Sequence, residues 1–124
     1  MRQPAGVPTG LWGERGPFDI LAFHPATGTL LVVEIKTDLP SVEGTLRKLD
    51  EKVRLAPEVA AKRLGWQVRN VARVLVMPNT RTLRRRVTEQ EPILKRALPQ
   101  RNVVVKRWLG APSGSISGLM LVSG

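Results

Sequence analysis

Two acidic residues and a lysine interrupt apolar stretches near the start of the chain. Asp19 lies in one such stretch (residues 18–24), and Glu34 and Lys36 lie near the end of the next (residues 29–37). The second stretch is rich in β-branched residues, and a Pro-Ala-Thr-Gly turn sequence separates the two. We therefore expect a β-hairpin that carries both acids.

The expected turn sets the distance between the two carboxylates. The register that pairs Pro25 with Gly28 also pairs Asp19 with Glu34, and directly opposed residues have Cβ atoms about 4.5–5.5 Å apart. Lys36 shares the face of Glu34 because alternate strand residues point the same way. Such carboxylates suit a hard divalent cation, Mg²⁺ with Mn²⁺ as a substitute, and the lysine could orient or deprotonate a water. The alternative is a cross-strand salt-bridge cluster on a solvated face.

The same alternation predicts the core of the hairpin. One face is uniformly apolar and is expected to be core: Phe18, Ile20, Ala22, Leu31, Val33 and Ile35. The face with the acids also carries apolar residues and is expected to be covered in part by a helix: Leu21, Phe23, Leu30 and Val32.

The rest of the chain alternates helical and strand patterns. Apolar residues three and four apart predict a helix over residues 41–64, which Pro57 kinks or divides into two helices. Strands are expected over residues 71–77, 102–108 and 119–122, and a helical stretch that Pro92 can break over residues 80–98. This order predicts an α/β fold with a mixed central β-sheet flanked by helices. The length fits a single domain (residues 1–124) with an irregular segment over residues 1–17.

The composition narrows the function classes. There are 20 Lys and Arg against 10 Asp and Glu, one histidine and no cysteine. A disulfide framework, a thiolate zinc site and a cysteine nucleophile are therefore excluded. The apolar runs are too short to span a bilayer and no signal peptide is evident, so we expect a cytoplasmic protein with no membrane partner.

The positive charge is concentrated in the second half of the chain. A net charge of +10 favours a polyanion partner, nucleic acid first, although a generally basic proteome would also explain it. The densest group is a candidate for phosphate contacts, with a merely solvated helix face as the alternative: Arg81, Arg84, Arg85 and Arg86.

An Asp at a strand end followed by Glu-x-Lys on the next antiparallel strand resembles the PD-(D/E)XK nuclease superfamily. The motif reads Phe-Asp19-Ile, twelve intervening residues, then Val-Glu34-Ile-Lys36-Thr. The resemblance implies a restriction-endonuclease-like core with magnesium held by Asp19, Glu34 and the Ile35 backbone carbonyl. It also implies that Lys36 is the catalytic lysine. Phe18 replaces the proline of the motif, as in many members.

Further site residues follow from this resemblance. Glu14 corresponds to an additional acid that members often carry on a helix before the first strand, although a solvated loop residue is the alternative here. Lys48 and Lys52, four apart in the helix over 41–64, could approach the metal or the scissile phosphate, or pair on the surface with Asp50 or Glu51. The missing first helix suggests a C-terminal fragment of a longer chain, with a DNA-reading module preceding it.

The sequence thus predicts a magnesium-dependent nuclease that cleaves phosphodiester bonds, with DNA favoured over RNA as the substrate. A homodimer is considered because many nucleases pair two active sites. The competing interpretation is a nucleic-acid-binding or regulatory domain that keeps the nuclease fold and cuts nothing.

Overall fold

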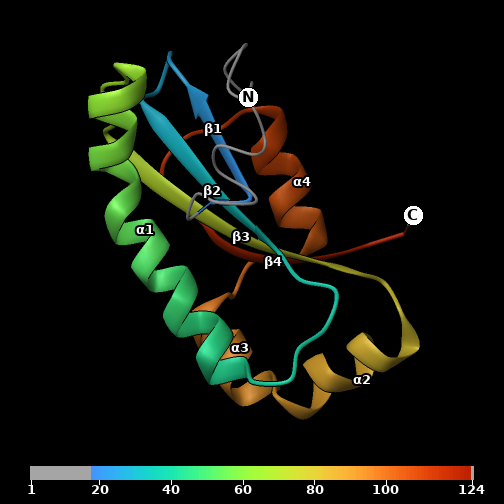
Figure 1. Cartoon of the computed structure of the whole chain (residues 1–124). Helices are drawn as coiled ribbons and strands as arrows, with labels where there is room; N and C mark the ends of the chain where they lie inside the picture. Colours follow the sequence, from blue (N-terminus) through green and yellow to red (C-terminus); the bar gives the residue numbers. More distant parts are fainter. Residues whose placement is uncertain (1–17, 124) are drawn as a thin grey trace.

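The computed structural model describes residues 18–123, which form one β-sheet with helices on both faces (Figure 1). Within this part, the elements are β1 (Ile20–His24), β2 (Thr29–Ile35), α1 (Val42–Leu64), β3 (Asn70–Pro78), α2 (Arg81–Glu89), α3 (Glu91–Ala97), α4 (Asn102–Gly110) and β4 (Ser117–Val122). The predicted fold class, a mixed sheet flanked by helices, is confirmed. No helix in residues 18–123 is long and apolar enough to cross a membrane. The segment 1–17 lies outside the described residues.

The sheet has the strand order β1-β2-β3-β4, with β1 antiparallel to β2 and the other neighbours parallel. The predicted hairpin and its register are confirmed, because Ile20 pairs with Val33 and His24 with Thr29. Gly28 in the turn has φ 66°, a conformation that favours glycine. Since parallel strands end at the same edge, the carboxyl ends of β2, β3 and β4 lie together, and β1 begins at that edge.

Helix α1 spans the predicted range. The Ser41 side chain accepts a hydrogen bond from the Gly44 N–H at 3.0 Å, and Gly65 ends the helix with φ 69°. The helix is continuous through Pro57, so the alternative of two helices was wrong. Leu49 and Ala60 are fully buried on either side of the proline, and this packing holds the helix together across the missing hydrogen bond.

The predicted helical stretch 80–98 is divided as Pro92 suggested. Helix α2 ends at Glu89 with Gln90 as its C-cap, and Pro92 lies in the first turn of α3, where its missing N–H leaves no hydrogen bond unmade. Thr80 caps α2 by accepting a hydrogen bond from the Leu83 N–H at 3.1 Å.

Both faces of the sheet are core. The face that carries Glu34, here called the α1 face, packs against α1, α2 and α3 and holds the larger apolar cluster. The opposite α4 face packs against α4 and includes Ala22, Leu31, Val33, Val74, Val105 and Trp108. The predicted core was therefore wrong at two positions. Phe18 precedes β1, is not bound by its alternation and joins the α1-face cluster, while Ile35, the last residue of β2, is 47% exposed.

The prediction of a strand over residues 102–108 was wrong, because this segment is helix α4. Its run of valines favours a strand locally, but the apolar residues on the α4 face of the sheet would be exposed to solvent unless a helix packed on them. As a helix, the segment places Val105 and Trp108, three residues apart, against that face, while Val103 remains 70% exposed. Burial in the tertiary structure outweighs the local β preference.

The outer edge of β4 is closed by the segment between α3 and α4. The Gln100 N–H donates to the Ser117 carbonyl at 3.0 Å, and the Gln100 carbonyl accepts from the Leu119 N–H at 2.9 Å. The Asn102 side chain donates to the Leu121 carbonyl at 2.7 Å and accepts from the Leu121 N–H at 3.0 Å. The Asn102 side-chain amide thus satisfies the backbone N–H and carbonyl of Leu121, as a neighbouring strand would.

Candidate active site

The carboxylates of Asp19 and Glu34 lie together where β1 begins and β2 ends. The Ile35 N–H donates a hydrogen bond of 2.8 Å to Asp19 Oδ2, which fixes Asp19 against the end of β2. The Glu34 side chain is only 4% exposed because it points into the α1 face. The hairpin register predicted this juxtaposition, although not the depth at which Glu34 is buried.

Lys52 of helix α1 reaches Glu34 from above the sheet. Its Nζ lies 2.6 Å from Glu34 Oε1, and its side chain is 22% exposed. Lys52 follows the buried Leu49 by three residues and precedes the buried Ala56 by four, so it lies on the helix stripe that faces the sheet. A second ion pair, between Asp50 and Arg73 of β3, also joins α1 to this face.

The environment raises the pKa of Glu34 above its ordinary value. Desolvation by burial is the main cause, and the neighbouring Asp19 carboxyl adds to it. The hydrogen bond and positive charge of Lys52 act in the opposite direction without cancelling the effect. Glu34 is therefore a carboxylate whose negative charge is costly to keep and which gains from a nearby cation.

The backbone at the end of β2 directs the Ile35 carbonyl toward the same place. The Lys36 N–H donates to the Val76 carbonyl at 3.0 Å, so it points toward β3. In a trans peptide the preceding carbonyl points the opposite way, and none of the described peptide bonds is cis. The Ile35 carbonyl is thus turned to the β1 side, where Asp19 lies.

The two remaining lysines of the prediction are placed differently. Lys36 directly follows the last residue of β2, is partly exposed, and forms no ion pair with residues 18–123. Lys48 is exposed one turn before Lys52 on α1, and it likewise has no ionic partner in the described chain. Of the two helix lysines, only Lys52 is brought to Glu34. Glu14 lies outside the described residues.

The donor set fits a magnesium ion that keeps several waters. Residues 18–123 contain no group of three or more His, Cys, Asp and Glu side chains that could hold a metal. The Asp19–Glu34 pair and the Ile35 carbonyl offer oxygen atoms only, and magnesium in proteins is often held by one or two carboxylates with waters and substrate phosphate completing its shell. A bound cation would offset the cost of keeping the negative charge of Glu34 buried.

The predicted phosphate-binding arginines divide into two groups. Arg86 donates to the Leu39 carbonyl at 2.8 Å and so ties α2 to the loop that follows Lys36. Arg84 donates to Asn79 Oδ1 at 2.8 Å. The remaining two arginines of this helix are exposed, Arg81 without an ion pair in the described residues and Arg85 at 3.7 Å from a Glu89 carboxylate oxygen. Arg81 and Arg85 are thus the ones that stay available for phosphates.

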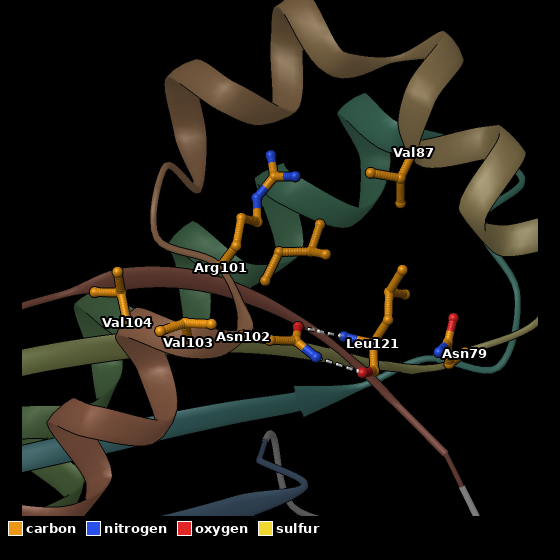
Figure 2. Close-up of a pocket in the computed structure, with 8 residues that line it drawn as sticks. Asn79, Val87, Arg101, Asn102, Val103, Val104 and Leu121 are labelled. Atoms are coloured by element: carbon orange, nitrogen blue, oxygen red, sulfur yellow. Dashed lines mark hydrogen bonds between the residues drawn. The ribbon is translucent and has the colours of Figure 1, made fainter.

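A cavity of about 400 Å³ lies elsewhere, at the β4 edge between α2 and the start of α4 (Figure 2). Its lining is mainly apolar, with Val87, Leu119 and Leu121 among the residues. The polar groups on it are already engaged, since Asn102 bonds to the β4 backbone and Arg101 pairs with Glu91 at 2.5 Å. This cavity is two strands away from Glu34 in the sheet order and contributes nothing to the carboxylate site.

Comparisons with protein-family models, with curated proteins and with solved structures found no match. The case for a function therefore rests on the residues themselves. Sequence reasoning named Lys52, together with Lys48, as a residue that could approach the metal, but it did not predict the ion pair of Lys52 with Glu34. The signal for it was the position of Lys52 on the inward stripe of α1, between Leu49 and Ala56.

Proposed function

We propose that this chain is a magnesium-dependent nuclease domain that hydrolyses phosphodiester bonds of nucleic acid, DNA in preference to RNA. The observation that carries the proposal is the nearly inaccessible Glu34 carboxylate held beside Asp19, with Lys52 of α1 paired to it and Lys36 two residues further along the chain. The resemblance to the PD-(D/E)XK nucleases supports it, because hairpin, helix and parallel strand follow in the order expected for that core.

Each residue has a distinct role in the proposed reaction. Asp19, Glu34 and the Ile35 carbonyl would hold magnesium, or manganese in its place, and the bound ion supplies positive charge that polarises the scissile phosphate. Lys36 Nζ would orient the attacking water or take its proton, and its charge offsets the charge that develops on the phosphate. The Ile35 N–H keeps Asp19 in position for this work.

The partner surface in this proposal is the exposed cationic side of α2. Arg81 and Arg85 would contact backbone phosphates, whereas Arg84 and Arg86 keep α2 and the adjoining loop in place. Cytoplasmic location and pairing of two copies belong to the same proposal. Pairing of two copies would bring two sites to the two strands of a duplex.

A second candidate is a nucleic-acid-binding or regulatory domain without catalysis. The observation that favours it is the ion pair between Lys52 and Glu34, since Glu34 already has a positive partner in the protein. In that case the buried acid serves stability alone, and the surface arginines would still bind phosphates.

The decisive experiment compares cleavage of supercoiled plasmid and of RNA by wild type, Glu34→Gln and Glu43→Gln, in magnesium, manganese and EDTA. Glu34→Gln keeps the shape of the side chain and removes its charge, so cleavage should fall by about 100-fold or more. Glu43 is an exposed acid on the first turn of α1, and its variant should cleave like wild type.

Equal cleavage by wild type and Glu34→Gln would refute the proposal. DNA binding without cleavage by wild type in either metal would favour the second candidate. If the Lys36→Ala variant cleaves as fast as wild type, the proposed role of Lys36 is refuted, whereas the assignment of the metal ligands is unaffected.

A further inference from the structure

Among residues 18–123, Lys52 is the cation that forms an ion pair with a candidate metal ligand. Its ammonium group lies 2.6 Å from Glu34 Oε1, a hydrogen-bonded contact between opposite charges. It therefore occupies one oxygen of the carboxylate that the proposed function assigns to magnesium. An ammonium group and a divalent cation on the same carboxylate repel each other, and the repulsion is strong where water is scarce.

The position of Lys52 allows it to leave. Glu34 is fixed in a strand and is 4% exposed, whereas the Lys52 side chain is 22% exposed and has four rotatable bonds. The lysine head can thus move toward solvent while its carbon chain stays against the sheet. Lys48 lies one helical turn before Lys52 on α1 and is exposed, so the ammonium group of a displaced Lys52 would join it at the surface.

We propose that Lys52 is an exchangeable counter-ion of the active site. It holds the buried Glu34 carboxylate while the metal is absent, and it gives up Glu34 and becomes available to a phosphate oxygen of nucleic acid when the metal binds. Metal and nucleic acid then strengthen each other's binding. Metal binding frees the Lys52 ammonium group, which nucleic acid can pair with, and nucleic acid that holds Lys52 frees the Glu34 carboxylate for the metal. This inference rests on the proposed function, and Lys52 is a positioning residue in it.

The first test measures magnesium and manganese affinity by isothermal titration for wild type, Lys52→Met and Lys62→Met without nucleic acid. Lys52→Met removes the competing charge, so metal should bind about 10-fold more tightly. Lys62 is on the same helix but pairs with Glu58 on the surface, with 73% of its side chain exposed, and its variant should bind metal like wild type. A purely structural role for Lys52 would leave the affinity unchanged or lower it.

The second test uses wild type, so that it does not depend on the folding of a variant. The protein is treated with an amine-specific acylating reagent, with and without magnesium, and the labelled lysines are located by mass spectrometry. Lys52 should be labelled several-fold faster once the metal has displaced it from Glu34, whereas Lys62 should react at the same rate in both conditions.

The outcomes separate this inference from the proposed function. If wild type binds neither metal, the proposed function fails and the exchange fails with it. If wild type binds metal, the exchange is overturned by a folded Lys52→Met protein with unchanged or weaker affinity. It is also overturned by labelling of Lys52 that does not respond to metal, and in both cases the nuclease proposal stands.

Discussion

Replacing Lys52 by methionine should destabilise the protein in a way that depends on pH. The substitution leaves Glu34 buried beside Asp19 with no positive partner in the part of the chain that the structure describes. Removing one member of a buried ion pair costs about 3–5 kcal/mol. Because 22% of the Lys52 side chain is exposed to solvent, we expect a loss somewhat below this range, about 2–3 kcal/mol at neutral pH. For a domain of this size that loss lowers Tm by about 10 °C or more.

The sign of the pH dependence follows from the pKa of Glu34. This pKa is already raised from 4.5 by burial, and loss of Lys52, which lowers it, raises it further. Between the pKa of the unfolded chain and that of the folded protein, the folded state binds more protons, so stability falls as pH rises. The destabilisation by Lys52→Met should therefore be small near pH 4.5 and should grow as the pH rises past the pKa of Glu34 in the folded variant.

The assay is urea unfolding of wild type, Lys52→Met, Glu34→Gln and the double variant at about pH 5 and pH 8. The double variant has no buried charge at this position, so it should recover most of the stability lost by Lys52→Met at the higher pH. Lys62→Met, which breaks an exposed pair, should leave the unfolding midpoint unchanged. An equal loss at both pH values without recovery in the double variant would refute the electrostatic reasoning and indicate lost packing alone.

Three further predictions concern other parts of the molecule. Asn102→Ala removes both side-chain hydrogen bonds to the β4 backbone and should cost about 2 kcal/mol in urea unfolding, and a neutral result would mean that water replaces them. Gly118→Ala places a Cβ 2.5 Å from Val105 Cγ2, so overpacking should cost about 1–3 kcal/mol, and an unchanged Tm would show that α4 moves freely. The double variant Arg81→Gln, Arg85→Gln should weaken DNA binding and reduce the slope of log affinity against log salt by about 2, and an unchanged slope would exclude these phosphate contacts.

The hairpin and its register could be predicted because both depend on neighbouring residues. The turn before Gly28 and the alternation on either side leave one register that buries both strands, and it places Asp19 opposite Glu34. Helix α1 was predictable for a similar reason, since its capping residue Ser41 and its periodic apolar stripe are local features.

Residues 102–108 could not be assigned from local pattern. Their valines favour a strand, and only the exposed apolar face of a sheet formed by distant segments makes a helix the better solution. The pairing of Lys52 with Glu34 could not be predicted from local pattern either, although the resemblance had made Lys52 a candidate for the metal site. Periodicity identifies the inward stripe of a helix, but it does not determine which strand residue that stripe meets. The same holds for Arg86, whose partner Leu39 is 47 positions away in the chain.

The hydrogen bonds of Gln100 and Asn102 along β4 limit how the protein can assemble. An incoming strand could extend the sheet on this side only by displacing the bonds to Ser117, Leu119 and Leu121. Edge-to-edge association through β4, whether in an ordered complex or in an aggregate, is thereby disfavoured. If two copies of the chain associate, we therefore expect their contact on a surface other than the β4 edge.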